Sequence, residues 1–217
     1  MNSMEQARFN MIEQQIRPWD VADAQVLHLL SVIKREQFVP AGRQTLAFMD
    51  MEIPLGFDAF MWQPKLEARV LHELQVQKFE RVLEVGTGSA YLTALLSRLA
   101  AQVASVEIVP ELSQQAAHKM AAHGFDNVQL EVGDASNSWG SIKYDVIVLT
   151  GSVPVEPRAF QQQLNIGGRL FAIVGDAPAM QAKVITRLAN DVFESVTLFE
   201  TNVAPLQNAY QPQRFVF

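Results

Sequence analysis

The sequence contains no cysteine, which excludes disulfides, thiolate nucleophiles and zinc–thiolate sites. It also lacks a basic excess: 17 Lys and Arg against 23 Asp and Glu give a formal charge of −6, whereas nucleic-acid grooves need a basic stripe. No apolar run approaches the ~18 residues of a membrane span, and the first residues carry no apolar leader segment. We therefore expect a cytoplasmic protein, a monomer or homodimer, that binds neither nucleic acid nor membrane and holds no metal.

The most informative stretch is RVLEVGTGSAY, from Arg81 to Tyr91. Residues Val82–Val85 have the pattern of a short buried strand, Gly86 and Gly88 follow at once, and leucines at helical spacing begin after Ser89. A strand, a glycine turn and a helix form the first half of a nucleotide-binding βαβ unit. Glycine suits the turn because it reaches positive φ and lets a ligand lie against the backbone.

Acidic residues around this turn favour a nucleoside that carries an amino acid over a dinucleotide. The dinucleotide fingerprint needs a third small residue where this chain has Tyr91. Glu84, two residues before Gly86, would repel a diphosphate but attract the amino group of an amino acid. Glu107 ends the second apolar strand, Val103–Val106, where a carboxylate accepts hydrogen bonds from ribose hydroxyls. Together the two carboxylates predict S-adenosylmethionine as the cofactor.

Beyond this point strands and helices alternate, which predicts a parallel sheet. A third strand leads into Gly133-Asp134-Ala135, so that three acids stand at three successive strand ends. The further expected elements are strands over 127–132, 144–149 and 169–174, helices from Pro110 to about 123 and over 157–164, and a hairpin of 183–188 and 193–200 around Asn190-Asp191.

Upstream of the glycine turn, helical patterns predict an N-terminal extension. Helices are expected over Met4–Ile16, after an N-cap at Asp20, and from Pro64, with an extended exit at Phe38-Val-Pro40. Residues 41–62 show no regular period, which is typical of a functional segment. The apolar tail from 213 to 217 is expected to pack against the body of the protein.

The expected fold is therefore α/β: a Rossmann-like, doubly wound, mostly parallel seven-stranded sheet with an antiparallel terminal strand and an N-terminal helical extension. We expect one structural unit in which residues 1–78, the extension and substrate-side segment, pack on a cofactor-binding core of residues 79–217. At 217 residues and 49% hydrophobic content, the chain is long and apolar enough to build such a core.

Several segments resemble one known family. Val82–Tyr91 closely matches VLEIGTGSGY of the protein-L-isoaspartate O-methyltransferases, and Glu36–Pro40, Glu52–Gly56, Asp145–Thr150 and Gln163–Leu170 match that family's pattern too. The resemblance runs from about residue 9 to residue 217, including the ending Arg-Phe-Val at 214–216. It implies a class I methyltransferase that uses S-adenosyl-L-methionine, releases S-adenosyl-L-homocysteine and methylates the carboxylate of isoaspartyl residues in damaged proteins, a repair activity.

The resemblance also assigns the cofactor contacts by position. The amino-acid end falls on Glu84 and the turn Gly86-Thr87-Gly88, the ribose on Glu107 with Ile108 beside it, and the adenine amino group on Asp134 with Ala135 beside it.

One departure concerns the acceptor. The family carries a Thr-Ile-Ser-x-Pro signature whose hydroxyls face the substrate; aligned on Pro64, its Thr falls on Phe60 and its Ser on Trp62. Smaller departures are Ala90 in place of glycine and the absence of a glycine after Ala135. The substrate-side residues are then Phe60, Trp62, Gln63 and Thr150, and the catalytic residue is unknown.

Three hypotheses follow for the chemistry. The enzyme methylates isoaspartyl carboxylates with help from backbone N–H groups near Gln63 and from Thr150; or the pocket takes a flatter, more apolar small molecule stacked on Trp62 and Phe60; or the protein binds the cofactor without catalysis. A carboxylate acceptor needs no general base, since its reference pKa of about 4 leaves it ionised near neutrality. An alternative interpretation of Trp62 is a simple core residue.

Overall fold

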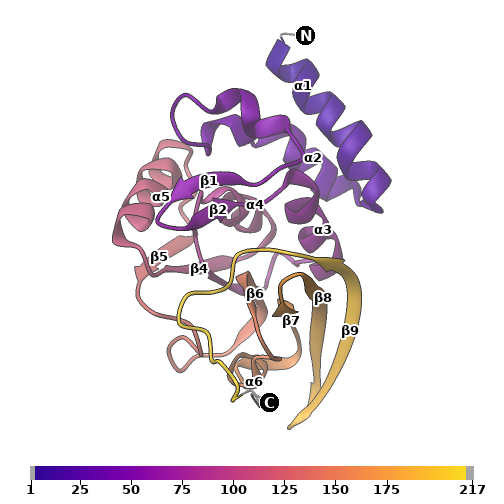
Figure 1. Cartoon of the computed structure of the whole chain (residues 1–217), viewed down its shortest axis with the longest axis vertical. Helices are drawn as coiled ribbons and strands as arrows, with labels where there is room; N and C mark the ends of the chain where they lie inside the picture. Colours follow the sequence, from indigo (N-terminus) through magenta and orange to yellow (C-terminus); the bar gives the residue numbers. More distant parts are fainter. Residues whose placement is uncertain (1–2, 214–217) are drawn as a thin grey trace.

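The computed structural model describes residues 3–213. Its main body is a seven-stranded sheet with helices before and between the strands (Figure 1). The strands of this sheet are β3 (Arg81–Val85), β4 (Gln102–Glu107), β5 (Val128–Val132), β6 (Tyr144–Val153), β7 (Leu164–Asp176), β8 (Ala179–Ala189) and β9 (Val192–Thr201). The helices are α1 (Ser3–Met11), α2 (Ala24–Val32), α3 (Pro64–Leu74), α4 (Tyr91–Leu99), α5 (Pro110–Ala122) and α6 (Arg158–Gln162).

The sheet has the order β5-β4-β3-β6-β7-β8-β9. Strands β3 to β7 pair in parallel, and β8 and β9 each pair antiparallel with the strand before them. The chain builds the sheet outward from β3 in two directions: β4 and β5 lie on one side of it, and β6 to β9 lie on the other. The carboxyl ends of β3, β4 and β6 therefore border one crevice. The expected mostly parallel sheet with an antiparallel terminal strand is confirmed, and Asp191, with φ +55°, turns the predicted hairpin.

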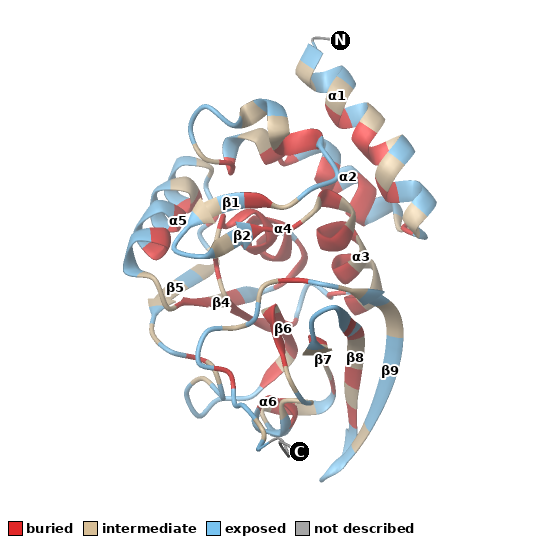
Figure 2. Cartoon of the chain, viewed as in Figure 1, coloured by how far each residue is buried: buried red, intermediate tan, exposed pale blue. Residues whose placement is uncertain are grey.

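Alternating side chains of the central strands build two cores, one on each face of the sheet. Val146 and Val148 pack toward the N-terminal helices and α3 to α5, whereas Ile147 and Leu149 pack toward α6 and the C-terminal segment. Strands buried on both faces read as continuous apolar runs, which is why β6 was visible in the sequence. Figure 2 shows this contrast, with β6 largely buried and the edge strand β9 largely exposed.

The N-terminal extension differs from expectation at three points. The N-cap of α2 is Asp23, whose carboxylate accepts hydrogen bonds from the backbone N–H of Gln25 and Val26; Asp20 instead adopts a left-handed conformation after a 3-10 turn, Arg17–Trp19. The expected helix over 4–16 changes at Ile12 into a π-helix, Ile12–Ile16. Phe38 closes a 3-10 turn over Arg35–Gln37 and is not extended.

The segment without a sequence period contains regular structure after all. A 3-10 turn covers Gln44–Phe48, and a short antiparallel hairpin follows, made of β1 (Ile53–Gly56) and β2 (Ala59–Met61). Strands of three or four residues are too short to show an alternation that stands out from chance. The hairpin leads directly into α3, which begins at Pro64 as predicted.

After β9 the chain crosses the sheet again. In Figure 1 this last segment (yellow) runs from β9 in front of β6. Ser152 at the end of β6 pairs with Pro205 in a parallel bridge, and Gly151 lets the chain approach closely, since a Cβ there would lie 2.7 Å from the backbone nitrogen of Leu206. The expected packing of the tail concerns residues that, apart from Gln213, lie outside the described part of the chain.

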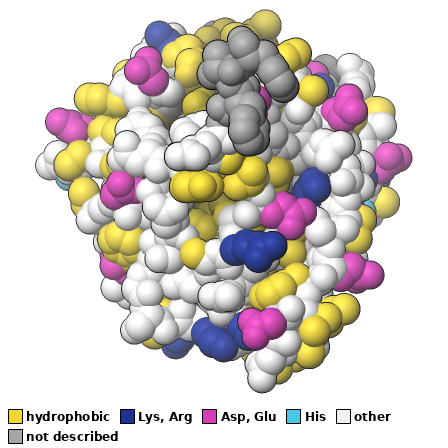
Figure 3. All heavy atoms as spheres, turned by 60° about the horizontal axis from the view of Figure 1, so that its bottom comes forward, with side chains coloured by type: hydrophobic (Ala, Val, Ile, Leu, Met, Phe, Trp, Pro, Cys, Tyr) yellow, Lys and Arg dark blue, Asp and Glu magenta, His cyan; other side chains and the backbone are white. Residues whose placement is uncertain are grey.

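Between residues 3 and 213 there is no helix of the length and apolarity needed to cross a membrane, nor a group of three or more acidic or histidine side chains placed to hold a metal. On the face shown in Figure 3, which looks at the bottom of Figure 1, acidic and basic side chains are interspersed among the coloured residues.

Candidate functional site

The glycine turn after β3 is closed by a threonine from the neighbouring strand. Gly86 has φ +94°, and a Cβ at this position would lie 2.1 Å from Oγ1 of Thr150 on β6. That hydroxyl lies 2.8 Å from the carbonyl oxygens of both Val85 and Gly86 and donates its one proton to this pair. Two independent reasons therefore require glycine at position 86: the positive φ and the close approach of Thr150.

Glu84 is a buried carboxylate with one free oxygen. Its side chain has no exposed surface, and its Oε2 accepts hydrogen bonds from Thr93 Oγ1 at 2.5 Å and Ser105 Oγ at 2.6 Å. Oε1 has no protein partner among the described residues. Burial raises the pKa of Glu84 to about 7, and the charge of Glu107 adds to the rise. A buried polar atom without a partner is costly, so this oxygen is suited to a ligand that donates a hydrogen bond or carries a positive charge.

The hydroxyls around Glu84 form a directed chain. Ser105, which is paired with Glu84 in the β3–β4 register, gives its proton to Glu84, so Thr87 Oγ1 must donate to Ser105 Oγ over 2.7 Å. This arrangement fixes Oε2 and leaves Oε1 as the open position of the carboxylate.

Glu107 ties the glycine turn to the end of β4. Its Oε2 accepts from the backbone N–H of Gly88 at 2.8 Å, and its Oε1 accepts from that of Val109 at 3.1 Å. The side chain is 5% exposed. Each carboxylate oxygen has two lone-pair sites, so both oxygens keep acceptor capacity for a pair of hydroxyl groups.

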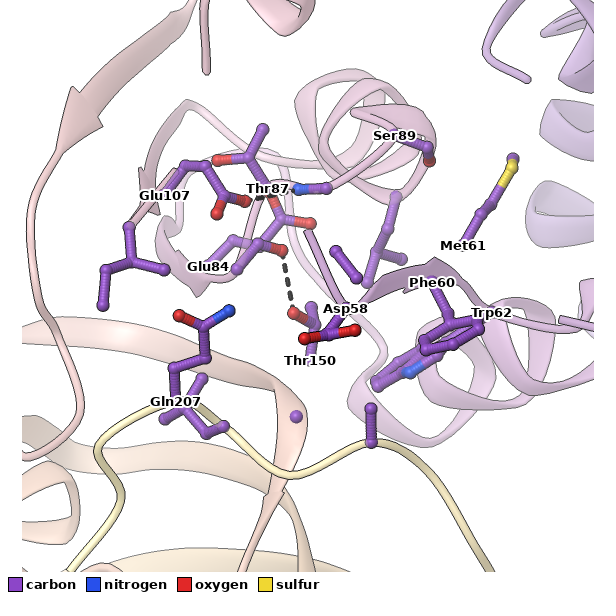
Figure 4. A pocket seen from close by; sticks show the side chains of 18 of the residues that line it. Asp58, Phe60, Met61, Trp62, Glu84, Thr87, Ser89, Glu107, Thr150 and Gln207 are labelled. Carbon is purple, nitrogen blue, oxygen red and sulfur yellow. Dashed lines mark hydrogen bonds between the residues drawn. The ribbon is translucent and has the colours of Figure 1, made fainter. Parts of the chain in front are cut away.

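These residues line one hollow at the crevice, with an empty volume of about 790 Å³ including its open mouth. Figure 4 shows Glu84, Thr87 and Glu107 on one side of it, Asp58, Phe60 and Trp62 on another, and Gln207 reaching in from the C-terminal segment. Its lining combines Glu52, Asp58–Trp62, Glu67, Glu84, Gly86–Ser89, Leu92, Glu107, Ile108, Thr150, Gly151 and Ala204–Gln207.

A second, smaller hollow continues past Glu107. It shares Gly86, Glu107 and Ile108 with the first and is also lined by Asp134 and Ala135. The exposed Asp134 accepts hydrogen bonds from Ser136 N and Asn208 Nδ2, both at 2.9 Å, and these bonds lower its pKa. The predicted contacts thus follow one another along a groove, from Glu84 through Glu107 to Asp134, in the order of the parts of an amino-acid-bearing nucleoside.

The wall opposite is aromatic and is held from behind by a buried ion pair. Trp62 is 5% exposed and packs edge-on against Phe171, at 6.2 Å between ring centroids, whereas Phe60 is 41% exposed. The fully buried Arg35 pairs with Glu67 and donates to the carbonyl oxygen of Trp62. Trp62 is therefore both a core residue and a lining residue, so the two interpretations of it are compatible.

Most predicted site residues line the two hollows, whereas Gln63 does not and the hydroxyl of Thr150 is already engaged. Gln63 precedes α3 and is not among the residues that line either hollow. Thr150 lines the first hollow, but its hydroxyl is engaged with the glycine turn. The roles of all these residues remain predictions.

Sequence reasoning missed the residues that support Glu84 and those that arrive from elsewhere in the chain. A polar Ser105 inside the apolar strand β4 was a usable signal, because it faces Glu84 in register. Leu206 and Gln207 carried no signal, since only the course of the C-terminal segment brings them to the hollow.

The chemistry of this site fits S-adenosylmethionine. Glu84 Oε1 offers a free anionic acceptor for an amino group, Glu107 offers acceptors for ribose hydroxyls, and the turn at Gly86 leaves room for a ligand against the backbone. An aliphatic or diphosphate ligand would leave these carboxylates unmatched.

Comparison with known proteins agrees with this assignment. The model of the family described as protein-L-isoaspartate(D-aspartate) O-methyltransferase (PCMT) matches residues 6–211. Protein-L-isoaspartate O-methyltransferase 1 of Rhodopseudomonas palustris strain HaA2 is 36% identical over 201 residues, which cover 92% of this chain and 82% of that protein.

Two solved structures share the fold. A Plasmodium falciparum structure assigned to protein-L-isoaspartate O-methyltransferase, in complex with S-adenosyl-L-homocysteine, superposes with a TM-score of 0.79 at 16% identity over 95% of this chain and 99% of that one. Another protein-L-isoaspartate O-methyltransferase gives a TM-score of 0.78 at 22% identity over 91% of this chain and 65% of that one. From the family match and the curated relative, this chain belongs to the protein-L-isoaspartate O-methyltransferase family.

Proposed function

We propose that this protein is an S-adenosylmethionine-dependent methyltransferase that esterifies the carboxylate of isoaspartyl residues in proteins or peptides. The observation that carries the proposal is the fully buried Glu84, which lines the hollow beside the glycine turn and has one carboxylate oxygen without a partner among the described residues. The acceptor is inferred from the family to which the chain belongs and from the activity named for its curated relative. The composition supports a cytoplasmic location.

When bound, the cofactor supplies the reactive methyl sulfonium, and the protein is left to bind, orient and exclude water. Glu84 would hold the amino group, Glu107 the ribose hydroxyls and Asp134 the adenine amino group. Thr150 keeps the Gly86 peptide in place from β6. No residue has to remove a proton from the acceptor, because a carboxylate is already ionised near neutral pH.

The aromatic wall supports a second candidate, methylation of a more apolar small molecule. Phe60 and Trp62 line the hollow where the family signature has hydroxyls, so a carboxylate there would face rings in place of donors. Backbone N–H groups near Gln63 would have to compensate, since the Thr150 hydroxyl is already engaged. Cofactor binding without catalysis is the third candidate.

One experiment separates the three. The protein is incubated with methyl-labelled cofactor and either an isoaspartyl peptide, the matching aspartyl peptide or a metabolite extract. Base-labile methyl ester on the isoaspartyl peptide alone is the expected result. Label transferred only to the extract would identify the second candidate, and cofactor binding by calorimetry without any transfer would identify the third.

A further inference from the structure

The tip of the β1–β2 hairpin holds a carboxylate over the hollow. Gly56 pairs with Ala59, so Phe57 and Asp58 form a two-residue turn with φ of +55° and +57°. Positive φ at both central positions is the geometry of a type I′ turn, which aspartate tolerates well. Figure 4 shows the Asp58 side chain pointing into the hollow, between Thr150 and the rings of Phe60 and Trp62. The turn therefore fixes where this charge stands.

Asp58 is one of two carboxylates of the hollow, with Glu52, that have no partner among the described residues. Glu67 is paired with Arg35, Glu107 accepts two backbone hydrogen bonds, and Glu84 accepts two hydroxyls. Within residues 3–213, Asp58 makes neither a hydrogen bond nor an ion pair, and no lysine or arginine lines the hollow. Burial raises the pKa of Glu52, which is half-buried, whereas Asp58 is exposed at the tip of the hairpin. Asp58 is therefore the exposed carboxylate on the acceptor side that no neighbouring cation offsets.

The hollow is independently marked as a ligand site by the fully buried, unpartnered Oε1 of Glu84. The positive groups of the cofactor match Glu84, which lies on the cofactor side. Asp58 lies on the same wall of the hollow as the exposed ring of Phe60, and a carboxylate and an aromatic ring together attract ammonium and guanidinium groups. An anionic acceptor alone would meet repulsion here, because nothing lining the hollow offsets Asp58.

We propose that Asp58 is a specificity-determining residue that selects isoaspartyl acceptors with a lysine or arginine next to the isoaspartyl residue. This inference rests on the proposed function and names the subset of its substrates that the pocket prefers. The neighbouring cation offsets Asp58 and contacts Phe60, while the isoaspartyl carboxylate is directed toward the cofactor side.

The test uses isoaspartyl peptides of one length that differ only at the neighbouring residue, which is lysine, norleucine or glutamate. Two series place this residue before or after the isoaspartyl residue. The enzymes are the wild-type protein, D58N, D58K and the control E194Q, which removes an exposed charge on β9 away from both hollows. Asparagine tolerates the left-handed turn as aspartate does, so D58N keeps the hairpin.

In at least one series at low ionic strength, we expect the wild-type KM to be about three- to tenfold lower for the lysine peptide than for the norleucine peptide, with glutamate worst. The preference should shrink as salt shortens the Debye length to about 10 Å at 0.1 M. It should vanish in D58N, reverse toward glutamate in D58K and persist in E194Q.

Ester on all peptides with equal KM in both series, or a lysine preference that survives in D58N, overturns this inference and leaves the proposed function standing. Ester on none of the peptides, with cofactor bound, overturns the proposed function itself and the inference with it.

Discussion

The two walls of the hollow are built in different ways. On the cofactor wall, Glu84 and Glu107 are 0% and 5% exposed, stand at the ends of two paired parallel strands, and have their positions fixed by hydroxyl and backbone donors. On the acceptor wall, Asp58 and Phe60 are exposed near the tip of a short hairpin, whereas Trp62 behind them is buried, at 5% exposure. The hairpin meets the C-terminal segment through one long hydrogen bond, 3.5 Å from Gln207 Nε2 to the Phe57 carbonyl oxygen.

The cofactor wall is therefore constrained by the sheet, whereas the exposed part of the acceptor wall is free to vary. A parallel sheet fixes the spacing of its strand ends, so a change at Glu84 or Gly86 disturbs both the sheet and the cofactor site. The exposed tip of the hairpin can change at little cost to the sheet, whereas Ile53 and Met61 of the same hairpin belong to the core. Side chains such as Asp58 and Phe60 are therefore free to differ from the family signature while the cofactor wall is retained.

The largest loss of cofactor affinity is expected from a substitution at Gly86, where the cofactor wall has no room for a side chain. Gly86→Ala places a Cβ 2.1 Å from Thr150 Oγ1 at a φ of +94°, so the turn must move. We expect cofactor affinity, measured by calorimetry, to fall by more than about 100-fold, since both the backbone angle and the hydroxyl contact are violated.

Gly42→Ala is a matched control, because Gly42 also has a positive φ, +78°, but nothing lies within 4 Å of the added Cβ. It should lower stability by about 1 kcal/mol and leave cofactor affinity unchanged. A Gly86→Ala protein that bound cofactor within a few-fold of wild type would show that the turn is not part of the site.

Next comes the charge of Glu84. Glu84→Gln should weaken cofactor binding about 10- to 100-fold, the range for a hydrogen bond to a charged group. Because the pKa of Glu84 is about 7 in the free protein, wild-type affinity should rise between about pH 6 and pH 8 as the carboxylate forms. The variant should lack this rise, and an identical pH profile in both proteins would contradict the assignment.

The same variant tests the burial of Glu84 through stability. The folded pKa, about 7, lies above the ordinary glutamate value of 4.5, so the folded protein binds more protons than the unfolded chain between these two pH values. Stability from this group is therefore greatest below about pH 4.5 and falls as pH rises through about 7, by on the order of 3 kcal/mol. Urea unfolding at pH 5 and pH 8 should show a smaller loss in Glu84→Gln than in wild type.

On the acceptor wall the expected effect is smaller and of opposite sign. Phe60→Thr restores a hydroxyl at a position that is 41% exposed, so it should fold normally and raise ester formation on an isoaspartyl peptide. Adding Trp62→Ser should raise the rate further, to about tenfold in all, the lower end for a hydrogen bond to a carboxylate.

The double variant needs its own control, because Trp62 also packs against Phe171 and its truncation should cost about 3–5 kcal/mol. Cofactor affinity and thermal unfolding of both variants show whether a lost rate is a lost fold. If Phe60→Thr keeps cofactor affinity and gains no ester formation, the hydroxyl explanation of the acceptor wall is wrong.

The same contrast explains how far the sequence alone predicts this molecule. The strand over 82–85, the glycine turn and Glu107 were predictable because apolar runs, φ-permissive glycines and strand-end acids are local signals. The N-cap at Asp23 was missed because Asp20 and Asp23 both precede the apolar stripe, and only the observed hydrogen bonds distinguish them. Asp58 and Gln207 meet at the hollow from segments about 150 residues apart, and such tertiary contacts leave no periodic pattern.

The smallest effect is expected at the far end of the cofactor wall, at the exposed Asp134. Two hydrogen bonds, from Ser136 N and Asn208, lower its pKa and keep it ionised, and its predicted contact with the adenine amino group is open to water. Asp134→Asn should therefore weaken binding of S-adenosyl-L-homocysteine only about threefold, as a surface hydrogen bond of about 0.5–1 kcal/mol implies. Adenosine alone should lose affinity by the same factor, whereas Glu84→Gln should leave adenosine binding unchanged, since Glu84 is predicted to hold the amino-acid end.

Asp126→Asn, which removes an exposed charge away from both hollows, is the control. If Asp134→Asn affected the full ligand but not adenosine, the order of contacts along the groove would be reversed, and the assignment of Glu84 to the amino group would have to be withdrawn with it.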